Sequence, residues 1–314
     1  MIRNSVLVLT ALLSASGVAG ANVTGGFLGQ SFAHRDVGWM ARDANPKHAW
    51  LYTASGQNDD TVRIYDLEGV FGPHEIGEIT DGLHAPNGMA VDSAGTLYVA
   101  NWNSNNPGGG VTIYPAGSVS PSLTLTQGLS VPLDAAADSE GNVYVANRGA
   151  SPAIVVYAKG QTAPSKTIAS SLITSPAQVQ VDPSNNVYFA DSNTGVSEIP
   201  YGSEQPISLG FQGLSVWSGL TLDPRNGWFY AADSQRVLAF QYGSPHPVRT
   251  LHPVFCAFFL ASGTVKGAEW IFAPQCQSDE VWVFRSGARK ALAPLDLPGA
   301  GTVNSVAFKP AGVP

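Results

Sequence analysis

Residues 92–101, Asp92-Ser-Ala-Gly-Thr-Leu-Tyr-Val-Ala-Asn101, occur again with small changes three times further along the chain. The copies read Asp138-Ser-Glu-Gly-Asn-Val-Tyr-Val-Ala-Asn147, Asp182-Pro-Ser-Asn-Asn-Val-Tyr-Phe-Ala-Asp191 and Asp223-Pro-Arg-Asn-Gly-Trp-Phe-Tyr-Ala-Ala-Asp233. The leading Asp residues, at 92, 138, 182 and 223, are 46, 44 and 41 positions apart. This period is typical of one β-propeller blade, so the repeat predicts a propeller.

Each copy consists of an apolar run, a short turn with Gly, Asn or Pro, and a second apolar run, which is the pattern of a β-hairpin. A third apolar strand follows each hairpin, and the same signature extends the count to six. These third strands are Val62–Tyr65, Val111–Tyr114, Ile154–Tyr157, Val196–Ile199, Val237–Phe240 and Val281–Phe284. Weaker fourth strands follow, for example Leu123–Thr126 and Pro247–Leu251. We therefore predict an all-β fold, a six-bladed β-propeller of four-stranded antiparallel blades.

Closure of the ring is the least determined part of this prediction. Val303–Phe308 resembles a further first strand, comparable to Asn87–Val91, although the chain ends at Pro314. One interpretation is that it completes the first blade, because pairing the two ends of the chain removes exposed sheet edges. Trp39–Arg42 or Phe27–Gln30 then takes another place in that blade. The alternative is a seventh, incomplete blade.

The composition limits the classes of function. The chain has 314 residues, 34 Gly, 22 Pro and 44% hydrophobic residues, enough apolar material for a packed core between many turns. Its formal net charge is −7 with only 16 Lys and Arg, whereas nucleic-acid binding needs a dense basic surface. We expect no nucleic-acid partner.

The first residues have the features of a secretory signal. Arg3 supplies the positive charge, residues 6–13 an apolar segment, and Ala19-Gly20-Ala21 a small-residue cleavage site. We expect a signal peptide at residues 1–21, a single propeller domain at 22–314, and a secreted or periplasmic location. No later apolar run is long enough to predict a membrane span.

The segment Pro86–Asn101 resembles the NHL repeat. The resemblance extends over residues from about 36 to 308 and is strongest between 85 and 240. It implies a propeller related in shape to gluconolactonase-type and strictosidine-synthase-like propellers. In gluconolactonase-like propellers, carboxylate and Asn ligands hold a divalent cation near the starts of the first strands, and Asn87-Gly88 matches the Asn-Gly element of that family.

First strands line the channel of a propeller, so their leading residues are candidates for a ligand site. The channel candidates are Asn87, Asp134, Gln178, Ser218 and Asn304. The resemblance makes Asn87, Asp134 and Asn304 the candidate ligands for Ca²⁺ or another divalent cation. Only Asp134 is a carboxylate, whereas Ca²⁺ favours several charged oxygen ligands. We therefore expect a polar channel without a resident cofactor, with the metal site as the alternative.

The loop that begins at Trp102 is longer than its counterparts and offers an aromatic side chain beside polar ones. Its binding candidates are Trp102, Asn103 and Asn105. Loops on a rigid scaffold often carry function. We therefore expect a binding module for a protein, peptide or glycan. The alternative is a metal-dependent lactonase-type hydrolase, and a third hypothesis is a structural surface protein.

Two further sets of residues have structural interpretations. Asp92, Asp138, Asp182 and Asp223 recur at the hairpin turns, and Asn101, Asn147, Asp191 and Asp233 recur at the hairpin ends, where short polar side chains stabilise turns. Cys256 lies at the beginning of one predicted strand, and Cys276 lies just beyond the end of its hairpin partner. In an oxidising compartment we expect them to form a disulfide.

Overall fold

The apolar runs of the repeat form β-strands, and their turns use residues that tolerate the left-handed backbone conformation. Gly95 and Gly141 have φ values of 83° and 85° at equivalent positions of two hairpins, and Asn185 has 64° in a third. Gly adopts this conformation without steric cost and Asn tolerates it, which explains why these residue types recur there. The computed structural model describes residues 37–55, 60–68, 70–102, 109–214, 219–233, 235–254, 257–275 and 278–312, and no helix occurs among them.

Six antiparallel sheets account for all the strands of the described residues. The second sheet along the chain contains β5 (Pro86–Val91), β6 (Leu97–Asn101), β7 (Gly110–Tyr114) and β8 (Leu123–Leu125). The third contains β9 (Pro132–Ala137), β10 (Val143–Asn147), β11 (Ala153–Tyr157) and β12 (Lys166–Ile168). The fourth contains β13 (Pro176–Val181), β14 (Val187–Asp191), β15 (Gly195–Ile199) and β16 (Ile207–Ser208).

The last two complete sheets follow the same order of strands. The fifth contains β17 (Gly219–Asp223), β18 (Trp228–Ala232), β19 (Val237–Gln241) and β20 (Arg249–Leu251). The sixth contains β21 (Ala261–Val265), β22 (Ala268–Pro274), β23 (Val281–Arg285) and β24 (Pro294–Leu295). Each of the six predicted third strands is therefore confirmed.

The first sheet is where the two ends of the propeller meet. It has five strands in the order β1 (Trp39–Met40), β4 (His74–Ile79), β3 (Val62–Leu67), β2 (Ala49–Ala54) and β25 (Ser305–Lys309). The C-terminal strand β25 pairs antiparallel with β2, so it completes the first blade, as one of the two sequence interpretations predicted. The seventh blade is excluded within the described residues. The strand β1 adds a fifth strand at the outer edge, which departs from four strands per blade.

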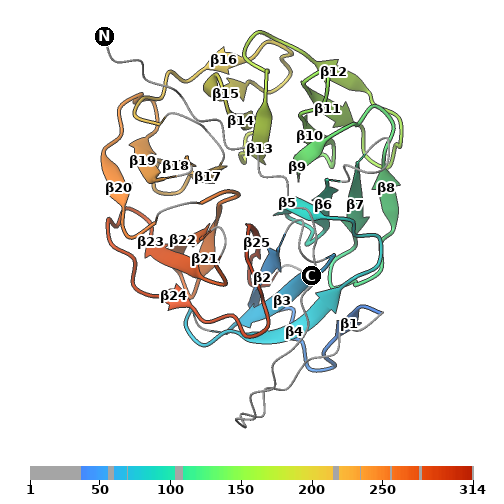
Figure 1. Cartoon of the computed structure of the whole chain (residues 1–314), viewed down its shortest axis with the longest axis vertical. Coiled ribbons are helices and arrows are strands. Elements are labelled where there is room, and N and C mark those ends of the chain that lie inside the picture. Colours follow the sequence, from blue (N-terminus) through green and yellow to red (C-terminus); the bar gives the residue numbers. More distant parts are fainter. Residues whose placement is uncertain are drawn as a thin grey trace, which may run out of the picture. The chain divides into compact units, whose positions relative to one another are not determined.

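The six sheets surround a central axis, and the strands β5, β9, β13, β17, β21 and β25 are the innermost of each (Figure 1). We call these the inner strands. Apolar side chains pack between neighbouring sheets, for example Val145 and Tyr157 of the third sheet with Val111 of the second. The core therefore consists of layers between blades, and it fixes the inner strands against one another.

Several sequence predictions fall on residues outside the described part of the chain. These are the signal peptide at residues 1–21, Asn103, Asn105, Ser218, Cys256 and Cys276. No helix of the described residues is long and apolar enough to cross a membrane.

Candidate functional site

The inner strands begin at one end of the central axis, which we call the strand-start end. Pro86, Pro132 and Pro176 are the first residues of β5, β9 and β13. Pro lacks a backbone N–H, so it is tolerated at the first position of a strand but not in its interior. The residues that immediately precede or begin these strands, and those that follow the antiparallel second strands, therefore lie at this end.

Asp134, the third residue of β9, is a link between inner strands. Its side chain is fully buried, and its Oδ2 accepts a hydrogen bond of 2.9 Å from the backbone N–H of Val179 on β13. On the other side lies Gly88 of β5, where a Cβ atom would overlap the Asp134 carboxylate. Burial raises the pKa of Asp134 well above its usual value, against the opposing effect of the N–H groups of Val179 and Ala135. Asp134 Oδ1 has no hydrogen-bond partner among the described residues.

Gln178 performs the same role one blade further on. Its amide is fully buried, and its Nε2 donates to the carbonyl of Leu260 at 2.9 Å. Its Oε1 accepts from the backbone N–H groups of Leu220 at 2.7 Å and Leu260 at 3.0 Å. Gln178 thereby joins β13 to β17 and to the segment that enters β21. Its hydrogen bonds link the polypeptide backbones of three blades.

Asn304 and Asn87 complete the described channel candidates. Asn304 donates from Nδ2 to the carbonyl of Ser55 at 2.8 Å, and its backbone N–H donates to Ala54 at 2.9 Å, so it holds the closing strand to the first blade. Asn87 is half-buried at the start of β5. Among the described residues, no group of three or more His, Cys, Asp and Glu side chains is arranged to hold a metal ion. Of the three candidate metal ligands Asn87, Asp134 and Asn304, only Asp134 has a carboxylate.

The repeated Asp and Asn residues make local hydrogen bonds. Asp138 Oδ1 accepts from the backbone N–H groups of Glu140 and Asn142, at 3.0 and 2.9 Å, within its own hairpin turn. Asn147 Oδ1 accepts from the N–H groups of Ser130 and Val131, at 2.9 and 3.1 Å, in the loop that precedes β9. These bonds agree with the structural role predicted for both sets.

An apolar cluster occupies the strand-start end beside these polar links. Leu133, Ala177 and Phe259 are buried at its centre, and Trp102, Val131 and Phe258 are half-buried around them. We call these six residues the aromatic cluster. They come from four separate parts of the chain: the residue after β6, the start of β9, the start of β13, and the segment before β21.

Only part of this cluster was predicted. Trp102 stood out because it enters a polar loop, whereas Phe258 and Phe259 belong to a generally apolar segment, Val254–Leu260, with no pattern that separates ligand contact from core. One signal could have found them. Phe258 and Phe259 lie just before a first strand, and Trp102 lies just after a second strand, and both positions are at the strand-start end.

Comparison with known proteins identifies the fold and no family. No family model matches the chain, and no curated protein matches it either. Among solved structures, 1237 chains match, so the fold is widely used. One of them, from the crystal structure of a nidogen/laminin complex, superposes with a TM-score of 0.67 and 14% sequence identity over 84% of this chain and 99% of that chain. A likeness at this identity shows the six-bladed propeller fold alone.

Proposed function

We propose that this protein is an exported interaction module that binds a protein or peptide partner at the strand-start end, through the aromatic cluster. The observation that carries the proposal is the half-burial of Trp102, Val131 and Phe258 around a buried apolar centre. Such side chains still expose apolar surface to water, and a partner that covers them removes this surface from water. Aromatic anchors of this kind are enriched among residues that dominate binding energy.

The polar links beside the cluster support a binding role. Asp134 and Gln178 fix the starts of β9, β13 and β17 through hydrogen bonds that are removed from water. A rigid surface loses little conformational entropy when a partner docks, which favours affinity. Both side chains form hydrogen bonds with the backbone of neighbouring blades. They therefore hold the strand starts, and the aromatic cluster beside them, in fixed positions.

The structural comparison is consistent with this proposal. The solved chain that covers 84% of this one comes from a structure titled as a complex of nidogen with laminin. A propeller of this fold therefore occurs within a complex of two proteins. The features of residues 1–21 support the proposed export to the secreted or periplasmic compartment. N-terminal sequencing of the mature protein tests the export; a mature chain that begins near Asn22 is expected.

Site-specific photocrosslinking in the source organism tests the binding surface. A photoreactive phenylalanine analogue replaces Trp102 in one variant and Tyr201 in the control variant. Tyr201 is 56% exposed but lies in the turn between β15 and β16, which is at the opposite end from the inner-strand starts. We expect a discrete protein or peptide adduct from position 102 and none from 201. Equal adducts from both positions, or none from position 102, would overturn the proposal.

The second candidate function is a metal-dependent hydrolase of the lactonase type, with Asn87, Asp134 and Asn304 as ligands. The observation that favours it is the buried Asp134 Oδ1, which has no hydrogen-bond partner among the described residues. Elemental analysis of the purified protein separates the two functions. One divalent ion per chain that is lost in Asp134→Ala would favour the hydrolase, and a metal-free wild-type protein would count against it.

A further inference from the structure

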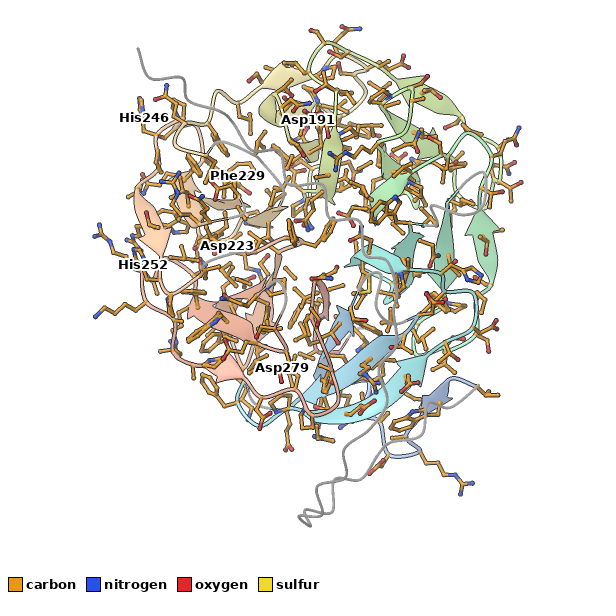
Figure 2. All side chains as sticks on the ribbon, in the orientation of Figure 1. Asp191, Asp223, Phe229, His246, His252 and Asp279 are labelled. Carbon is orange, nitrogen blue, oxygen red and sulfur yellow. The ribbon has the colours of Figure 1, made fainter. Side chains whose placement is uncertain are left out.

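A basic groove lies at the outer rim between the fifth and sixth blades, remote from the inner strands. Its volume is about 260 Å³. It is lined by Pro247, Val248, Arg249, Thr250, His252 and Arg289. Figure 2 shows His252 at the outer edge of the ring of blades. We call this feature the rim groove.

The walls of the rim groove are joined by backbone hydrogen bonds between two blades. The N–H of His252, which follows β20, donates to the carbonyl of Arg289 at 2.8 Å, and the N–H of Ala291 donates back to His252 at 2.8 Å. His252 and Lys290 thereby form an isolated parallel bridge. The groove is therefore part of the folded framework and is present before any ligand arrives.

The cationic side chains of the groove have no acidic partner among the described residues. The guanidinium of Arg249 lies over the ring of Trp228, 4.7 Å from its centroid, which fixes its position. Next to it lies Gly287, where a Cβ atom would stand 3.1 Å from Arg249 Nη1. Arg289 and Lys290 are exposed. Within the described part of the chain, Arg249, Arg289 and Lys290 form no salt bridge.

The segment of the chain that forms the groove carries a net positive charge, unlike the rest of the sequence. Residues 237–295 contain five Lys and Arg and three Asp and Glu, a net of +2, whereas the whole chain has −7 and the remainder therefore −9. A positive region on an acidic protein attracts anions selectively, because the rest of the surface repels them. Arginine binds carboxylate and sulfate groups through paired N–H donors.

We propose that the rim groove binds the carboxylate or sulfate groups of an acidic polysaccharide. Its volume lies below the ~300–1,000 Å³ of pockets that enclose whole drug-sized ligands, so it takes one charged unit of a longer chain. An acidic peptide would most readily add as a strand along the free edge of β20. The bridge between His252 and Lys290 already covers the continuation of that edge, which favours the polysaccharide.

Calorimetric titration of the full-length protein with two probes, a sulfated dextran oligosaccharide and oligogalacturonate, tests the proposal. The variant Arg249→Gln/Arg289→Gln removes two charges from the groove. The control Arg42→Gln/Lys159→Gln removes two exposed charges from the first and third blades. We expect wild-type protein to bind at least one probe, the groove variant to bind it at least tenfold more weakly, and the control to match the wild type. Inorganic sulfate should compete better than chloride at equal ionic strength.

Three results would overturn the proposal. If the wild type binds neither probe, an acidic polysaccharide is not the ligand. An equal loss of affinity in both variants indicates a diffuse effect of net charge. Preferential binding of an aspartate-rich peptide, lost in the groove variant, assigns the groove to a peptide instead. Circular dichroism of each variant checks that the fold is retained. A change confined to the groove leaves photocrosslinking at position 102 intact, so the two proposals fail separately.

Discussion

Asp134 Oδ2 and the backbone N–H of Val179 are 2.9 Å apart, and this hydrogen bond joins the inner strands of two neighbouring blades. The carboxyl group that makes it is fully buried, and no described cation pairs with it. A buried carboxyl without a cationic partner resists ionisation. The link between the blades is therefore made by a carboxyl group whose neutral form is favoured by its burial.

The substitution Asp134→Asn should change how stability depends on pH. Burial raises the pKa of Asp134 in the folded protein above the value of 3.8 expected when unfolded. Between these two pKa values the folded state binds more protons than the unfolded state, so the free energy of unfolding falls as pH rises from about 4. Asparagine keeps an acceptor for the Val179 N–H and has no such dependence. Denaturant unfolding between pH 4 and 8 should show a smaller fall for the variant.

Asp138→Asn is the matched control, because it makes the same replacement of a carboxyl by an amide in the turn that follows β9. Asparagine keeps an acceptor for the turn N–H groups but loses the oxygen that accepts from Asn142 Nδ2 and the Tyr144 hydroxyl. The free energy of unfolding should therefore fall, but the pH dependence assigned to Asp134 should remain. Parallel curves for the wild type and Asp134→Asn would show that Asp134 titrates alike in the folded and unfolded states.

Closure of the ring should be sensitive to one glycine. Gly263 on β21 lies against Phe308 on β25, and a Cβ atom at position 263 would overlap the ring atoms Cδ1 and Cε1 of Phe308. Overpacking of this kind costs about 1–3 kcal/mol, so Gly263→Ala should lower the free energy of unfolding by that amount. Chemical denaturation measures the change.

A double-mutant cycle with Phe308→Ala tests the cause. Phe308 also stacks on Phe272 with ring centroids 5.5 Å apart, so its removal destabilises the protein alone. If the two side chains compete for one space, Gly263→Ala should cost little when Phe308 is already absent. Additive costs would show that the glycine is required for another reason.

The repeat was a reliable guide to structure because its information is local. The Asp138 turn is encoded within five residues, since its carboxylate binds N–H groups of Glu140 and Asn142. Ring closure was also accessible, because Val303–Phe308 has the apolar pattern of a first strand without the rest of a blade. Strand β1 was less accessible. Trp39–Arg42 was one of two segments expected to join the first blade, and two residues at a sheet edge carry no recognisable period that would place them.

The surfaces proposed for binding were less predictable, because each depends on contacts between distant residues. Phe258 and Val131 are 127 positions apart in the sequence and pack against the same buried cluster. The rim groove likewise depends on the bridge between His252 and Lys290. Asp134 and Gln178 were recognised as inner-strand residues, but their hydrogen bonds to the backbone of other blades follow from the inter-blade register, which a repeat does not encode.

A disulfide between Cys256 and Cys276 remains a prediction, because both residues lie outside the described part of the chain. The bond would close a loop of about twenty residues and stabilise the fold by about 3 kcal/mol on the chain-entropy estimate. Alkylation of the unfolded, unreduced protein followed by mass spectrometry should find no free thiol. Recovery of two alkylated cysteines from protein purified under oxidising conditions would exclude the bond.

Lys309 should make stability rise with pH in the alkaline range. It lies on the closing strand β25, is fully buried, and donates from Nζ to the carbonyl of Pro46 at 2.9 Å, with the Trp50 ring centroid 4.3 Å away. Burial lowers its pKa from 10.5 to about 8, although the charge of Asp66 acts in the opposite direction. Between these two values the unfolded state binds more protons than the folded state, so the free energy of unfolding increases as pH rises from about 8 to about 10.5.

The substitution Lys309→Met isolates this contribution. Methionine fills similar space without a charge, so the stability of the wild type relative to the variant should increase by about 2 kcal/mol between pH 7 and pH 10. The comparison cancels the titration of the buried tyrosines, which is common to both proteins. Lys166→Met, at an exposed ion pair with Glu204, should show no such increase. A wild-type advantage that stays constant with pH would mean that the Lys309 ammonium is as stable in the folded protein as in the unfolded chain. Its contacts with Pro46 and Trp50 would then offset the whole cost of its burial.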